Sequence, residues 1–167
     1  MENNFLDNES LVNEITYIIV NARNNVIKNV NNELINAYWN IGRIIVEDEL
    51  KSERGEYGKK QLLTLSKTLT NKFGKGFSRA NLQNMRLLYL KYPNCQTLSS
   101  KLSWSHYCEL LYISDDDKRS FYEKEAINAN WSVRELKRQI STSLFERLLL
   151  SNGEANKKRV LELALRW

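Results

Sequence analysis

The sequence predicts an all-α protein of about seven helices, and three observations support this fold class. Apolar residues recur at spacings of three and four along nearly the whole chain, and no segment alternates as a half-buried strand does. Glycine (6) and proline (1) are too scarce for the many tight turns of an all-β chain. A length of 167 residues corresponds to one domain that can bury its own core.

The first expected element is a long N-terminal helix. Residues 1–9 are polar and are expected to form a flexible end, while Ser10 can cap a helix that runs to about Leu50. Its apolar stripe consists of Leu11, Ile15, Ile18, Ala22, Val26, Val30, Leu34, Tyr38, Ile41 and Ile45. A break near Asn31–Asn32 is the alternative, because Asn is a poor helix former. So long a stripe predicts that residues 10–50 pack against a second copy or a partner such as a nuclease. The alternative is a bent helix that folds back on its own bundle and buries the same stripe.

Two shorter helices joined by a glycine turn are expected next. The first spans Lys59 to Phe73, and Gly74 is placed to end it in the left-handed conformation. Ser78 can cap the second, which carries one apolar face up to Tyr92. Such a pair is typical of a helix-turn-helix, in which the second helix reads the DNA major groove. A plain helical hairpin with a polar outer face is the alternative.

The rest of the chain contains further helical segments with their own start signals. The expected segments are Trp104 to Ile113 after Ser103, Lys118 to Ala129 after the acidic run from Asp115, and Ser132 to about Leu150 with Glu135 completing a capping box. A C-terminal helical tail is expected over residues 151–167. The polar loop from Cys95 to Lys101 leaves a short β-wing open as an alternative.

Positive charge is concentrated in the middle third of the chain. Between Tyr57 and Cys108 there are nine Lys and Arg residues and no Asp or Glu, whereas the rest of the chain carries 16 basic and 20 acidic residues. A one-signed segment inside a mixed chain indicates a surface for a polyanion. The alternative is a solvated face that happens to lack acids.

The helix-turn-helix interpretation assigns these side chains to double-stranded DNA. The residues expected to face bases, which Arg, Gln and Asn can recognise in the major groove, are Arg79, Gln83, Arg86, Asn81 and Asn84. The residues expected to face phosphates are Lys59, Lys60, Lys67, Lys72 and Lys75.

Catalytic and metal-binding patterns are weak. Asp117 and the triplet Glu135-Leu136-Lys137 match the letters of a PDDEXK nuclease motif, whose carboxylates surround a divalent metal. On a helix, however, Glu135 and Lys137 point to different faces. The single histidine, His106, and the two cysteines lack the number and spacing of a zinc site. The sequence therefore predicts no metal, no cofactor and no enzymatic activity.

The chain is expected to be cytoplasmic. It has no run of about 18 apolar residues, so no contact with a membrane is predicted. Met1 is followed by Glu2 and asparagines rather than by a basic and then an apolar segment, which argues against a secretory signal.

Several strings resemble the bacterial YhcG family in the order in which that family carries them. They are AYWNIGR at 37–43, EYGK at 56–59 with LSKTL at 65–69, FGKGFSRANL at 73–82, LSWSHY at 102–107, FY at 121–122 and WSVREL at 131–136. The similarity covers residues 10–150, which it identifies as a YhcG-like N-terminal helical domain.

The resemblance implies a helical module that family members join to a C-terminal PDDEXK-type nuclease domain. The family's metal-binding carboxylates have no matching positions before Trp167, so none is carried over. The leading expectation is a non-catalytic DNA-binding module of a nuclease-associated, defence-related system. The alternative is a helical module for dimerisation that recruits a partner nuclease, and an autonomous nuclease ranks third.

Overall fold

The described part of the chain contains helices and no strands, as predicted. A computed structural model describes residues 3–51, 55–151, 158, 160 and 162. Its α-helices are α1 (Asn3–Lys51), α2 (Gly55–Phe73), α3 (Arg79–Lys91), α4 (Trp104–Leu110), α5 (Asp116–Asn128), α6 (Val133–Ser141) and α7 (Leu144–Leu150). Short 3₁₀ turns η1 (Lys75–Phe77) and η2 (Cys95–Thr97) complete the fold. The β-wing alternative is wrong, because η2 occupies that loop.

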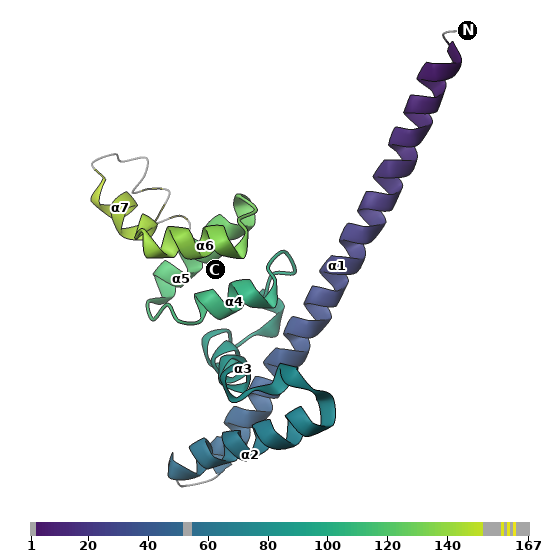
Figure 1. Cartoon of the computed structure of the whole chain (residues 1–167). Helices are drawn as coiled ribbons and strands as arrows, with labels where there is room; N and C mark the ends of the chain where they lie inside the picture. The colour runs from purple at the N-terminus through teal and green to yellow at the C-terminus, as the bar shows by residue number, and fades with distance from the viewer. Residues whose placement is uncertain (1–2, 52–54, 152–157, 159, 161, 163–167) are drawn as a thin grey trace.

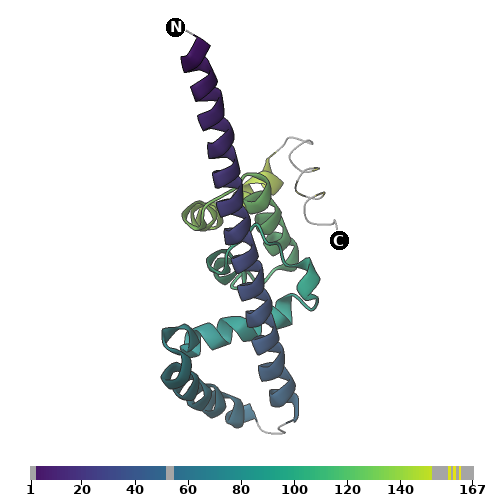
Figure 2. The ribbon, with the colours of Figure 1, turned by 90° about the vertical axis from the view of Figure 1, so that its right-hand side faces the viewer.

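Helix α1 is a single helix of 49 residues that dominates the shape of the molecule. It begins at Asn3, so the expected start after Ser10 is too late, and it continues without a break through Asn31–Asn32. At 1.5 Å per residue it is about 73 Å long. Its C-terminal half crosses α3, while its N-terminal half projects beyond the other helices (Figures 1 and 2).

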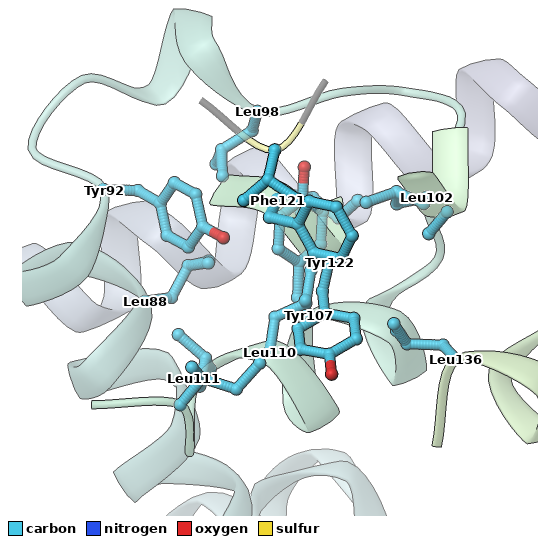
Figure 3. Packing of buried hydrophobic residues seen from close by; sticks show 14 residues of the cluster. Leu88, Tyr92, Leu98, Leu102, Tyr107, Leu110, Leu111, Phe121, Tyr122 and Leu136 are labelled. Atoms are coloured by element: carbon cyan, nitrogen blue, oxygen red, sulfur yellow. The ribbon is translucent and has the colours of Figure 1, made fainter. Parts of the chain in front are cut away.

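The main core lies where α3, α4, α5 and α6 meet one side of α1. Tyr107, Phe121 and Tyr122 are fully buried and lie among leucines of these helices (Figure 3). The rings of Phe121 and Tyr122 pack edge to face with centroids 5.3 Å apart. Burying each large apolar side chain contributes about 1.5–3 kcal/mol. Val160 joins this core, while the rest of the expected C-terminal helix lies largely outside the described residues.

A second, smaller core holds α2 in place. Ile45 of α1, Leu62 of α2, and Leu82 and Met85 of α3 form its buried centre. Leu65 and Leu69 pack against it from the same side of α2. The inner face of α2 is therefore fixed to α1 and α3, which leaves its outer face to solvent.

Three predicted N-caps are confirmed. The side chain of Ser78 accepts a hydrogen bond from the backbone N–H of Asn81 at 3.2 Å, and that of Asp115 accepts one from Lys118 at 2.9 Å. Ser132 accepts from the N–H of Glu135 at 3.2 Å. The second half of the predicted capping box is wrong, because the Glu135 carboxylate accepts hydrogen bonds from Arg138 and Gln139 instead.

The predicted continuous helix from Ser132 to Leu150 is also wrong. Ser143 adopts a left-handed conformation with φ of 54°, which separates α6 from α7. The hydroxyl of Tyr122 lies at this break, donating to the carbonyl of Gln139 at 3.1 Å and accepting from the N–H of Phe145 at 3.2 Å. A buried side chain from α5 thus satisfies backbone groups that a continuous helix would pair internally.

A buried carboxylate sits inside the main core. Glu123 is only 4% exposed, and its oxygens accept hydrogen bonds from the hydroxyls of Tyr92 at 3.0 Å and Tyr107 at 3.5 Å. Arg119 lies over the ring of Tyr92, 5.5 Å from its centroid. Burial raises the pKa of Glu123 above its usual range, and the tyrosine hydrogen bonds only partly oppose this shift.

This network predicts a pH-dependent stability. Because its folded pKa is raised, Glu123 stabilises the fold below its unfolded pKa near 4.3, and this contribution is lost as pH rises through the folded value. Glu123→Gln retains an acceptor but cannot ionise, so the variant should gain free energy of unfolding relative to wild type with rising pH. Each unit of pKa difference corresponds to about 1.4 kcal/mol. Urea unfolding of both proteins between pH 4 and 7.5 measures the gap, and a gap independent of pH would contradict the assignment.

Candidate nucleic-acid interface

Five exposed cations follow one another along α2, η1 and the start of α3. We call them the basic strip, and they are Lys60, Lys67, Lys72, Lys75 and Arg79. Lys60 and Lys67 are seven residues apart on α2, so they project from nearly the same face. The salt bridges of the described residues involve none of the five. Among the side chains that the structure describes, no acid pairs with the strip, which presents its positive charge to solvent. Lys59 belongs to α2, but its side chain lies outside the described residues.

The strip is held on a rigid support. The hydroxyl of Ser66 on α2 donates to the carbonyl of Phe77 at the end of η1, at 2.9 Å. Together with the second core, this bond fixes the turn against α2. Charges on a fixed surface can meet a regularly spaced polyanion without first ordering a loop.

The turn between α2 and α3 begins at a glycine with positive φ, although not in the predicted left-handed helical conformation. Gly74 has φ 92° and ψ −164°, a region that essentially only glycine adopts, and its N–H bonds to the carbonyl of Thr70 at 2.9 Å. Gly76 has open space where a side chain would begin. Phe73 is exposed, with the ammonium of Lys72 5.4 Å from its ring centroid. The turn thus offers accessible backbone and an aromatic face beside two lysines of the strip.

Three of the five expected base-facing residues make contacts inside the protein. Asn81 donates to the carbonyl of Gly76 at 2.6 Å and accepts from the indole N–H of Trp104 at 2.9 Å, which ties the turn to α4. Asn84 donates to the sulfur of Cys108 at 3.4 Å and accepts from the hydroxyl of Tyr112 at 2.9 Å.

Arg86 is the third. Its guanidinium forms an ion pair with Glu49 near the C-terminal end of α1, with Nε 2.7 Å from the carboxylate and both side chains largely shielded from solvent. The geometry therefore does not support base contacts by Arg86, Asn81 and Asn84. Arg79 is exposed and Gln83 is half-buried, so base contact by these two stays a prediction.

Glu135 and Lys137, which match the letters of the nuclease motif, each bind another side chain of the protein. Glu135 on α6 binds Arg138 at 2.6 Å, and this hydrogen bond followed by that of Gln139 holds its pKa below the usual range. Lys137 lies 3.5 Å from Glu109 of α4. No group of three His, Cys, Asp or Glu side chains placed to hold a metal occurs among the described residues.

His106 has a structural position instead. Its Nε2 lies 2.9 Å from the carbonyl oxygen of Trp131, which can only accept, so Nε2 carries the proton. Nδ1 then accepts from the backbone N–H of Ser103 at 3.2 Å. His106 thereby joins the start of α4 to the connection between α5 and α6.

A pocket of about 310 Å³ opens at the end of α3 and the start of α5. Lys91, Arg119 and Glu123 line it together with Tyr92. Lys91 and Arg119 both donate to the carbonyl of Ile113, and Glu123 accepts from two tyrosines. The pKa of Lys91 is lowered by burial and by the nearby Arg119. The polar groups of these three side chains are thus engaged by backbone and tyrosine groups of the protein itself, so the pocket is a weaker site than the strip.

The contact between Asn81 and Trp104, which helps to hold the turn between α2 and α3, was not predicted from the sequence. The indole of Trp104 and the amide of Asn81 come from different helices, and both fall in strings that carry the family resemblance. That resemblance was the one signal that could have found them. Among the helices that the structure describes, none combines the length and the apolar character that a membrane span requires.

Comparison with known proteins places this helical arrangement in a family. The family model described as "DUF1016 N-terminal domain" matches residues 14–147. The protein described as "Putative nuclease YhcG" from Escherichia coli (strain K12) is 37% identical over an alignment that covers 84% of this chain and 46% of that protein. The chain thus spans about half the length of this relative. No solved structure matches it significantly. The expected resemblance is confirmed, and the chain belongs to the DUF1016 N-terminal domain family.

Proposed function

We propose that this chain is a nucleic-acid-binding module that grips the backbone of double-stranded DNA through the basic strip. The observation that carries the proposal is the run of five exposed cations on α2, η1 and α3, none of which forms a salt bridge with a side chain that the structure describes. Neutralising phosphates releases condensed counterions, and this release drives the binding of such surfaces to DNA. The name of the Escherichia coli relative, a nuclease, fits a polyanionic ligand.

In the proposed complex, most contacts are made to DNA phosphates and few are made to bases. Asn81, Asn84 and Arg86 already have partners inside the protein, so at most Arg79 and Gln83 reach base edges. A helix-turn-helix that inserts α3 deeply into the major groove would have to break the ion pair of Arg86 with Glu49. Shallow docking on the backbone keeps these contacts, so weak sequence preference is expected.

The module acts without its own catalytic site in this proposal. Cleavage would belong to a nuclease with which it is associated, in a system such as a defence system in the bacterial cytoplasm. The PDDEXK-like letters support no cleavage by this chain, because Glu135 is held by Arg138 on the exposed side of α6.

A titration with three fluorescent nucleic acids tests the proposal. We expect the chain to bind a 20-base-pair duplex more tightly than an RNA or DNA single strand of the same length at 0.1 M salt. The logarithm of duplex affinity should fall with the logarithm of salt with a slope of about −4 to −5, if the five cations each meet one phosphate. Anisotropy measures both quantities. Absence of duplex binding at 50 mM salt would overturn the proposal, and preference for single strands would overturn its duplex specificity.

A second candidate function is assembly, which one specific observation favours. The N-terminal half of α1 carries large apolar side chains that no described part of the chain covers. Residues 10–50 were expected to pack on a second copy or a partner nuclease, and the projecting part of α1 is the surface available for this.

A further inference from the structure

One face of the projecting half of α1 is apolar and open to solvent. We call it the apolar face, and it consists of Leu11, Val12, Ile15, Ile18, Ile19, Ala22, Val26 and Val30. Its seven large side chains are 45–65% exposed. At 100° per residue all eight lie within an arc of about 120°. They expose on the order of 700 Å², more than the apolar patches of about 300–600 Å² on ordinary monomers.

The described body of the protein does not cover this face. The residues of α1 that pack on the body, such as Ile35, Trp39 and Val46, point roughly 140° away from the centre of the apolar face. Where α1 first passes the loop at Leu98 and Ser100, a groove is lined by asparagines and Lys28 of α1 rather than by apolar residues. Bending α1 toward the body would therefore bury polar side chains and leave the apolar face exposed.

The composition of α1 makes packing necessary. Twelve of the first 40 residues are Asn, which is a poor helix former. Helices in water depend mainly on packing of an apolar face, because intrinsic propensity alone stabilises them little. A standard interface takes about 800 Å² from each partner, close to the area that the apolar face exposes.

The distribution of charged residues along α1 indicates which partner binds the apolar face. Along the projecting half, Glu9 and Glu14 precede Arg23 and Lys28. A parallel second copy would place acid beside acid and base beside base, whereas an antiparallel copy places the acidic part of one helix beside the basic part of the other. We propose that the apolar face binds the same face of a second copy of this chain, with the two α1 helices antiparallel. This inference goes beyond nucleic-acid binding and specifies the partner in the assembly candidate.

The central residues of the face indicate one register for this pair. A two-fold axis between Thr16 and Tyr17 places Leu11 against the partner's Ala22 and Ile15 against the partner's Ile18. In these two layers a large side chain faces a small or an equal one, whereas Ile19 and Val26 lie opposite the positions of the partner's Glu14 and the partner's Asp7 at the edge of the contact. The same register puts Glu9 on the same flank as the partner's Arg23, so two ion pairs border the interface. The bodies of the two copies lie at opposite ends of the paired helices.

Light scattering of the whole chain tests the pairing. We expect wild type at 100 μM to have twice the chain mass of 19.6 kDa. Ile15→Glu with Ile18→Glu should restore the single-chain mass. The matched control is Tyr17→Glu with Val20→Glu, because both residues are exposed on the other side of the same helix. This control should remain a dimer. A monomeric wild type, or equal effects of the two variants, would overturn the proposal.

A charge exchange tests the orientation. Glu9→Arg and Arg23→Glu alone should each raise the dimer dissociation constant several-fold, and the combined variant should recover most of the wild-type value. No recovery would overturn the antiparallel register. The assay is separate from nucleic-acid binding, since replacing Lys67 and Lys72 should leave the mass unchanged whether or not DNA binds.

Discussion

Replacing Lys60, Lys67, Lys72 and Lys75 together by glutamine should lower the affinity for duplex DNA by about 10²–10³-fold at 0.1 M salt. The four side chains are exposed and take part in no salt bridge of the described residues, so their loss should leave the fold intact. Each phosphate contact that is removed also removes a released counterion. Anisotropy with a labelled duplex measures the loss, and circular dichroism verifies folding.

The matched control removes the same charge elsewhere. Lys28, Arg134, Lys137 and Lys158 are exposed on other elements, and replacing them by glutamine also takes the formal net charge from +5 to +1. A binding site on the basic strip predicts a loss of less than about tenfold for this control, since long-range attraction is largely screened at this salt. Equal losses for the two variants would mean that net charge alone drives binding.

Gly42→Ala should destabilise the fold strongly for a change of one methyl group. A Cβ at Gly42 would lie 2.0 Å from the carbonyl oxygen and 2.7 Å from the carbonyl carbon of Met85, both backbone atoms of α3. Alanine would therefore force α1 and α3 apart along the contact that joins the two cores. Overpacking of this kind costs about 3 kcal/mol or more, against a gain of about 1 kcal/mol in helix propensity. Thermal unfolding should show a Tm lower by at least about 5 °C.

Gly76→Ala provides the comparison for this substitution. A Cβ there meets no atom within 4 Å, so its Tm should lie within about 2 °C of wild type. If Gly42→Ala were as stable as Gly76→Ala, the close crossing of α1 and α3 would be contradicted.

The helices and several of their ends could be predicted because their signals are local. Ser78, Asp115 and Ser132 cap helices through bonds to N–H groups three residues away, and Gly74 ends α2 within its own turn. Helical periodicity identified the apolar stripes for the same reason. Features that depend only on residues close together in the sequence can therefore be predicted from it.

The differences between the predicted and the observed structure arise from contacts between residues that are far apart in the sequence. The separation of α6 from α7 depends on the hydroxyl of Tyr122, which is 23 residues before Phe145. The face of α3 looked free on a helical wheel, yet Arg86 is bound by Glu49, 37 residues earlier, and Asn84 is bound from α4. A helical wheel shows which residues of a helix lie outside its apolar face, but it does not show whether another helix packs against those residues. Lys60 and Lys67 stayed exposed because only the opposite, inner side of α2 is packed, and Lys72 is exposed at the C-terminal end of the helix, after the last packed residue, Leu69.

The salt dependence of duplex binding by wild type and by the four-lysine variant tests the central claim most directly. Both affinities are measured with the same duplex between 50 and 200 mM salt. If the basic strip contacts phosphates, the slope of log affinity against log salt should be shallower in the variant by about three to four units, near 0.9 for each lost contact. Equal slopes for the two proteins would contradict the assignment of the strip as the nucleic-acid interface.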